Sequence, residues 1–224
     1  MKKLNLFKNV DSIIFDFDDT IVNEEYWIKS RWKKTFQFCE NDLNLKNFGS
    51  LFWKVYHEKG AQDKKHVDEV INILGESKSL VKKIVLNFLA QKTNEKLIKK
   101  VDDFINIIKS EFKLGIITNG NKDIQLERIK NTGLNYCFNS IICSESIKKP
   151  SEKIFFESLK DLKVKAKNSI YIGNDYNTDC ITPMKIGMKV VHLSSFYYKC
   201  AANKYFSVSN YNDLIKIYYE NYKK

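Results

Sequence analysis

The sequence has little of what several common kinds of site require. Its five cysteines are scattered and include no CxxC pair, and its three histidines, His57, His66 and His192, lie far apart. Zinc sites are recognised from closely spaced Cys and His ligands, so we expect neither a zinc site nor a histidine metal cluster. The odd number of cysteines indicates buried or free thiols in a reducing compartment rather than a disulfide framework.

Long apolar runs and blocks of charge are also absent. No segment approaches the roughly 20 apolar residues of a membrane span, and the amino-terminal MKKLNLFKNVDS has no apolar stretch long enough for a signal peptide. We therefore expect a cytoplasmic protein without a membrane partner. The net charge of +11 is a feature of nucleic-acid-binding proteins, but no run of adjacent Lys or Arg exceeds two. We prefer a dispersed lysine surface and expect no nucleic-acid partner.

The pattern of apolar residues changes along the chain. Ser12–Phe15 is a short apolar run, which predicts a buried parallel strand. After it, apolar residues recur at helical spacing in stripes that begin at Ile28, Phe48, Val67 and Val81. This predicts an all-helical block that interrupts the chain after its first strand.

From about Thr93 the pattern predicts helices and strands in alternation. A helix is expected over 97–108, strands over 113–118, 140–143, 169–172 and 189–193 with helices between them, and a closing helix over 211–219. Such alternation predicts a parallel sheet with helices on both faces. The expected fold class is α/β: a Rossmann-like parallel sheet with helices on both faces, plus an inserted all-helical cap domain. The expected domain ranges are 1–21 with 93–224 for the core and 22–92 for the insert.

Polar residues follow the predicted strands, and sheets of this kind bind ligands at the carboxyl ends of their strands. Asp16 and Asp18 follow the first strand, and an extended chain points both to the same side. One carboxylate can attack while the other handles protons, and together they can hold a hard cation. Thr118, Asn119 and Gly120 end the next strand and can cradle a phosphate before a helix. An acidic turn and a helix start are the corresponding structural alternatives.

Two more segments fall at the same predicted edge. Lys148-Lys149-Pro150-Ser151 places a lysine where it can screen charge between a phosphate and the carboxylates. Residues 173–179 return acid and amide oxygens to the edge, and magnesium prefers oxygen ligands. A surface lysine and a polar loop are the alternatives for each segment alone. Because all four segments share one sheet edge, together they indicate a single site.

The segments SIIFDFDDT, IITNG, KKPSEKIF and YIGNDYNTD resemble, in order, the motifs of the haloacid dehalogenase superfamily, and the helical insert resembles that family's cap. The resemblance implies that Asp16 is the nucleophile and Asp18 the general acid and base. It implies that Thr118 binds the transferring phosphoryl group and that Lys149 steadies nucleophile and phosphate. It also implies an Mg²⁺ cofactor bound by Asp16, by the backbone carbonyl of Asp18 and by residues of the fourth motif.

The fourth motif departs from the commoner family form. The usual Gly-Asp is here Gly173-Asn174, followed by Asp175. Either Asn174 supplies an amide oxygen to the metal or Asp175 is the ligand, and we favour Asp175, with Asp179 supporting the ligands.

Asp18 determines the expected reaction class. Dehalogenases of the family lack this aspartate, whereas a phosphatase needs a proton for the leaving oxygen. The expected function is Mg²⁺-dependent hydrolysis of a small phosphomonoester, such as a sugar, nucleotide or polyol phosphate. In the insert, Glu25, Tyr26 and Arg31 are candidate substrate contacts, and helix-start charge and aromatic packing are the alternatives. A phosphomutase of the same family, a phosphoaspartate signalling receiver and a nucleic-acid-binding protein remain the alternative functions.

Overall fold

The computed structural model describes residues 6–60, 63, 65–194 and 205–222. The chain divides into two compact units, which we call the sheet unit, Met1–Glu24 with Glu95–Lys224, and the helical unit, Glu25–Asn94. The domain ranges 1–21 with 93–224 and 22–92 stay a prediction of where a core and its insert meet. Each unit is described by itself below.

A parallel six-stranded sheet forms the centre of the sheet unit in the described part of the chain, with the order β3-β2-β1-β4-β5-β6. The strands are β1 (Ser12–Phe15), β2 (Lys113–Asn119), β3 (Ser140–Ser144), β4 (Ser169–Gly173), β5 (Lys189–Leu193) and β6 (Tyr205–Val208). The five strands predicted from apolar runs are confirmed. Strand β6, which pairs with β5 at the edge of the sheet, was not predicted.

The helices of the sheet unit differ from the prediction at two places. They are α5 (Val101–Ile108), α6 (Lys122–Asn131), α7 (Glu152–Leu162), α8 (Ile181–Lys185) and α9 (Tyr211–Asn221), with the short helices η1 (Asn135–Cys137), η2 (Ala166–Asn168) and η3 (Tyr176–Cys180). The prediction of a helix from residue 97 was wrong, because Leu97 pairs with Val22 in an isolated antiparallel bridge. The single helix expected between the strands 169–172 and 189–193 is divided into the π-helix η3 and the α-helix α8.

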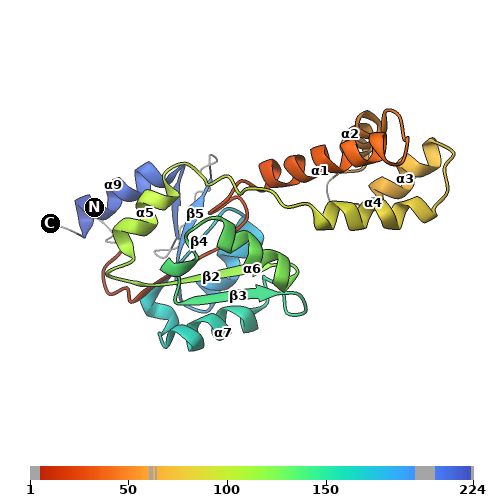
Figure 1. The fold of residues 1–224 in the computed structure, drawn as a ribbon. Helices are drawn as coiled ribbons and strands as arrows, with labels where there is room; N and C mark the ends of the chain where they lie inside the picture. The colour runs from red at the N-terminus through yellow and green to blue at the C-terminus, as the bar shows by residue number, and fades with distance from the viewer. Residues whose placement is uncertain (1–5, 61–62, 64, 195–204, 223–224) are drawn as a thin grey trace. The chain divides into compact units, whose positions relative to one another are not determined.

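Alternation of side chains along the strands produces two apolar cores. Ile13 and Phe15 of β1 face a core that α5 and α9 close, whereas Ile14 faces a second core closed by α7. Helices therefore cover both faces of the sheet, as predicted, and the layers are visible in Figure 1. Burial of each large apolar side chain stabilises the fold by about 1.5–3 kcal/mol, so both faces hold the sheet in place.

The helical unit is built around stacked aromatic rings. It contains α2 (Phe48–Lys59), α3 (His66–Ile73), α4 (Ser79–Ala90) and nearly all of α1 (Glu24–Asn41). Its core is centred on Trp32 of α1, whose ring centroid lies 4.0 Å from that of Phe52 and 4.4 Å from that of Phe88. The predicted all-helical insertion between β1 and β2 is confirmed.

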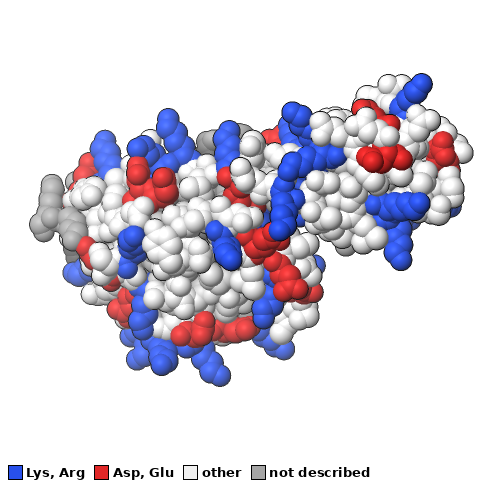
Figure 2. All heavy atoms as spheres, in the orientation of Figure 1, with Lys and Arg blue, Asp and Glu red and all other residues white. Residues whose placement is uncertain are grey.

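The cysteines, the helices and the surface charge can be compared with what the composition predicts. Cys39, Cys137, Cys143 and Cys180 are free thiols, and Cys200 lies outside the described residues. Among the helices of the described ranges, none is both long and apolar enough to cross a membrane. On the face shown in Figure 2, Lys and Arg side chains lie singly or in small groups with Asp and Glu between them, in keeping with a dispersed lysine surface.

Candidate active site

The order and register of the strands bring the polar segments of the sequence together. Strand β1 lies between β2 and β4, and Phe15 at its end pairs with Ile116 and with Ile172. The backbone N–H of Asp16 donates to the carbonyl of Ile172 at 2.8 Å, which fixes the first residue after β1 against β4. The carboxyl ends of these three parallel strands therefore form one edge, where Asp16 lies.

Lys149 is the centre of a buried cluster at this edge. Its Nζ lies 2.5 Å from Asp16 Oδ1 and 2.7 Å from Asp179 Oδ1, and it donates to the hydroxyl of Tyr171 at 3.2 Å. The side chain of Asn119 holds the main chain of Lys149, since its Oδ1 accepts from the Lys149 N–H at 2.8 Å. Sequence reasoning thus placed Lys149 and Asp16 together correctly, whereas the role of Tyr171 was not foreseen.

The surroundings of Asp16 in this cluster shift its pKa. Burial raises its pKa to about 7; the neighbouring Lys149 opposes the shift, and Asp179 adds to it. The same two carboxylates raise the pKa of Lys149 above its usual value, against the effect of burial. The ammonium group of Lys149 therefore forms ion pairs with two buried carboxylates.

The side chain of Asn174 tests whether the site fits a metal ion. In one orientation its Oδ1 faces Asp16 Oδ2 and the backbone carbonyl of Asp18, each at 3.2 Å, and in the opposite orientation its amide NH₂ donates to both. The turned amide satisfies both acceptors by hydrogen bonds, and the other orientation would offer a metal one oxygen from each of three residues, which is the donor chemistry that Mg²⁺ prefers. The group formed by Asp16, Asp18 and Asn174 therefore fits a hard cation such as Mg²⁺.

The carboxylate of Asp175 caps the helix that follows it. Its side chain is exposed and caps η3, accepting from the N–H of Thr178 at 2.8 Å and from its hydroxyl at 3.0 Å. This capping explains why Asn174, rather than Asp175, faces Asp16. The preference for Asp175 as the charged metal ligand is thus not supported by the contacts of its carboxylate.

Asp18 belongs to a second cluster, which the sequence did not reveal. Its Oδ1 lies 2.7 Å from Arg128 Nη1, and its Oδ2 accepts from Gln125 Nε2 at 3.0 Å. Gln125 Nε2 also donates to Thr118 Oγ1 at 2.7 Å, and Arg128 Nε donates to Glu95 Oε1 at 2.9 Å. The sequence shows that a glutamine and an arginine lie in the first turns of the helix after β2. It contains no pattern that pairs either of them with Asp18.

Both clusters contain more carboxylates than cationic side chains. Each contains two carboxylates and one cationic side chain, namely Asp16, Asp179 and Lys149 in one and Asp18, Glu95 and Arg128 in the other. Within the described ranges, no three His, Cys, Asp or Glu side chains gather as a metal site.

The backbone of the loop after β2 differs from the prediction at Gly120. The backbone N–H of Gly120, predicted to face a phosphate, instead donates to the carbonyl of Ser144 at 2.9 Å. Thr118 is buried at the end of β2, and its hydroxyl accepts the hydrogen bond from Gln125. Thr20 was not predicted to act, yet its hydroxyl donates to Asp16 Oδ2 and to Asn174 Oδ1, each at 3.3 Å.

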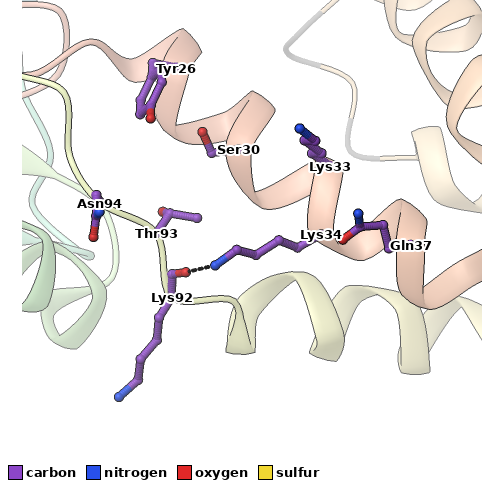
Figure 3. Close-up of a pocket in the computed structure, with 8 residues that line it drawn as sticks. All are labelled: Tyr26, Ser30, Lys33, Lys34, Gln37, Lys92, Thr93 and Asn94. Atoms are coloured by element: carbon purple, nitrogen blue, oxygen red, sulfur yellow. Dashed lines mark hydrogen bonds between the residues drawn. The ribbon is translucent and has the colours of Figure 1, made fainter.

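The three candidate substrate residues of the helical unit lie in different surroundings. Tyr26 lines a cavity of about 390 Å³ between α1 and the segment 92–94, where Lys34 Nζ donates to the carbonyl of Lys92 at 2.5 Å (Figure 3). Glu25 is exposed and forms an ion pair with Lys29 at 2.5 Å, which lowers its pKa.

Arg31 is buried, and its guanidinium binds the backbone of its own unit. Its Nε donates to the carbonyl of Gln91 at 3.0 Å and its Nη2 to that of Leu89 at 3.1 Å, and it lies over the ring of Trp27. These contacts hold α1 to the end of α4, and a contact of Arg31 with substrate stays a prediction.

Comparison with known proteins places this geometry in a family. Residues 13–193 match the model of the haloacid dehalogenase-like hydrolases. The chain is 24% identical over 217 residues to a glyceraldehyde 3-phosphate phosphatase of Methanocaldococcus jannaschii, covering 92% of this chain and 94% of that protein. It is 28% identical to pyrimidine 5'-nucleotidase YjjG of Escherichia coli over 96 residues, which are 42% of this chain and 43% of that protein.

A solved structure shares the fold. The HAD-hydrolase YfnB from Bacillus subtilis, bound to magnesium, superposes with a TM-score of 0.71 at 20% identity, over 94% of this chain and 99% of that one. Apart from Ser12, the family match spans the four sequence segments, and it includes the helical insertion between β1 and β2. The chain therefore belongs to the haloacid dehalogenase-like hydrolases.

Proposed function

We propose that the chain is an Mg²⁺-dependent phosphatase that hydrolyses a small phosphomonoester through a phosphoaspartate on Asp16. The observation that carries this proposal is the buried contact of 2.5 Å between Lys149 Nζ and Asp16 Oδ1 at the end of the central strand. A carboxylate held by one ammonium at a sheet edge is a nucleophile with a counter-charge in place for an incoming anion. The phosphatases among the relatives that cover most of both chains support the same reaction.

In the first step, an oxygen of Asp16 attacks phosphorus, and the bond from phosphorus to the leaving oxygen breaks. Asp18 donates a proton to that oxygen, and it then takes a proton from the water that hydrolyses the phosphoaspartate. Lys149 and the hydroxyl of Thr118 bind phosphoryl oxygens, and Asp179 keeps Lys149 in place at 2.7 Å. Uncatalysed monoester hydrolysis is slow enough that rate enhancements reach ~10²¹-fold, so these groups act together.

Asp16, the backbone carbonyl of Asp18 and the side chain of Asn174 would hold Mg²⁺. The bound ion would neutralise charge that develops on the phosphoryl oxygens. Asp175 remains the alternative ligand, through the carboxylate oxygen that does not accept from Thr178. The magnesium in the YfnB structure supports the same cofactor here.

The proposed substrate is a small phosphorylated metabolite, with triose, sugar, polyol and nucleoside monophosphates as the first candidates. The relatives include a glyceraldehyde 3-phosphate phosphatase and a nucleotidase, so both substrate classes belong in the screen. Of the predicted substrate contacts, Tyr26 remains the best candidate, because it lines a cavity whereas Arg31 is committed to backbone carbonyls.

A phosphate-release screen over such a panel tests the proposal. We expect release of inorganic phosphate from at least one monoester, dependent on added Mg²⁺ and on no bisphosphate activator. Dependence on a bisphosphate, with phosphate returned to substrate, would indicate a phosphomutase. Release at full rate in excess chelator would contradict the metal.

A further inference from the structure

Asp18 is held by side chains that lie outside the four sequence segments. We call Gln125, Arg128 and Glu95 the Asp18 clamp. Gln125 Nε2 donates to Asp18 Oδ2 at 3.0 Å, and Arg128 Nη1 lies 2.7 Å from Asp18 Oδ1. Oδ2 therefore accepts a hydrogen bond, whereas Oδ1 faces the guanidinium as an ion pair, and the carboxylate is held by a neighbour at each oxygen.

The two residues that touch Asp18 are also joined to each other. Arg128 Nη1 donates to Gln125 Oε1 at 3.0 Å, and both side chains extend from the same face of α6, where positions three apart are neighbours. Asn121 caps the start of α6 by accepting from the N–H of Ile124 at 3.1 Å. The clamp is thus built on a helix whose beginning is fixed at the end of β2.

Glu95 fixes the arginine from the other side. Arg128 Nε lies 2.9 Å from Glu95 Oε1 and its Nη2 lies 3.2 Å from Glu95 Oε2, in a pair whose two side chains are 5% and 0% exposed. Bidentate pairing of this kind sets the orientation of a guanidinium as well as its position. Arg128 pairs with both Glu95 and Asp18, so Glu95 acts on Asp18 through the guanidinium.

Gln125 connects Asp18 with the residue that binds the anion. Its amide nitrogen donates to Asp18 Oδ2 and, at 2.7 Å, to Thr118 Oγ1. One amide thus sets the position of the proton-transfer group relative to the hydroxyl that binds the phosphoryl group. Buried polar networks of this kind do little for stability compared with an apolar core, so holding geometry is the better account of why this one is present.

We propose that Gln125 and Arg128 are positioning residues that hold Asp18 in line with the leaving oxygen of the substrate, and that Glu95 holds Arg128 for this purpose. The inference rests on the proposed function. Asp18 must reach the leaving oxygen while the bond from that oxygen to phosphorus breaks. A displacement of about 1 Å in such a geometry lowers rates by about 10²-fold.

The test compares two substrates that differ in their need for a proton. The leaving oxygen of an alkyl phosphate must be protonated, whereas the phenolate of 4-nitrophenyl phosphate leaves without a proton. For Gln125→Met we expect kcat/KM to fall about 10- to 100-fold with the alkyl phosphate that the panel selects, and no more than about threefold with 4-nitrophenyl phosphate. Because kcat/KM ends at phosphoenzyme formation, the later attack of water does not enter.

The ratio of the two kcat/KM values is measured on one preparation, so a partly unfolded variant does not affect it. Arg128→Lys keeps the charge but not the fork of donors, and we expect it to shift the ratio in the same direction by a smaller factor. Lys130→Met, on an exposed position of α6, is the matched control and should leave the ratio unchanged. Equal losses with both substrates would overturn the inference while leaving the phosphatase intact. A wild-type protein that hydrolyses neither substrate would instead overturn the proposed function.

Discussion

Replacing Gly173 by alanine is expected to damage the site through a single methyl group. A Cβ on Gly173 would lie 2.4 Å from Asp179 Cβ, 2.5 Å from its Cγ and 2.6 Å from its Oδ2. These distances are far below van der Waals contact, so Asp179 must move by about 1 Å, and π-helix η3, which carries Asp179, must move with it. Asp179 Oδ1 would then lose its hydrogen bond of 2.7 Å from Lys149.

The magnitude follows from these two effects. Overpacking costs about 1–3 kcal/mol, and loss of a hydrogen bond to a charged group costs about 1.5–3 kcal/mol. Together they amount to about 2.5–6 kcal/mol, which for a chain of this size lowers Tm by about 5–24 °C. We expect turnover to fall as well, because Lys149 loses one of the two carboxylates that hold it.

Thermal unfolding followed by circular dichroism measures the effect, with Gly115→Ala as the matched control. Gly115 is also buried in a strand of the same sheet, but a Cβ there would meet the flexible end of Leu162 at 3.2 Å, so the cost should stay near about 1 kcal/mol. A Gly173→Ala protein as stable as the Gly115→Ala protein would refute the reasoning about the close approach of Asp179.

Three further predictions concern the charged groups. Burial raises the pKa of Asp16 from 3.8 to about 7, so its contribution to stability is full below about pH 4 and is lost as the pH rises through about 7. The Tm of Asp16→Asn relative to wild type, measured in chelator, should therefore increase between about pH 5 and pH 8. A difference in Tm that stays constant over this range would contradict the pKa shift. Asn174→Ala should weaken apparent Mg²⁺ affinity about 10-fold or more, measured as the Mg²⁺ dependence of phosphate release, whereas Asp175→Asn should leave it within about twofold; the reverse order would restore Asp175 as the ligand. Lys149→Met should destabilise the fold by about 3–5 kcal/mol in chemical denaturation, because it leaves Asp16 and Asp179 without their cation; a loss below about 1 kcal/mol would show that the buried charges are compensated elsewhere.

Sequence alone was sufficient where local patterns determine structure. The apolar runs at Ser12–Phe15 and in β2 to β5 predicted their strands, since strands buried on both faces are continuously apolar. The short edge strand β6 was missed because a sequence of four residues carries little pattern and its pairing with β5 is a tertiary contact. Leu97 fitted the helical stripe, but pairing with Val22 took it out of the helix.

The site was predictable only as far as the ends of the strands. Asp16 and Lys149 follow strand-end patterns, and the structure brings their charged atoms within 2.5 Å. The choice between Asn174 and Asp175 depends on which side chain caps the following helix, and two adjacent polar residues do not reveal this. The contact between Gln125 and Asp18 joins residues 107 positions apart, so no local pattern announces it.

The central claim is that Asp16 carries the phosphoryl group during turnover. Acid quenching of the working enzyme, followed by mass spectrometry of its peptides, tests this directly. We expect one phosphoryl group on the peptide that contains Asp16, none in Asp16→Asn, and turnover of that variant near background. An Asp16→Asn protein that keeps a tenth of normal activity, or a phosphoryl group on another residue during turnover, would contradict the account.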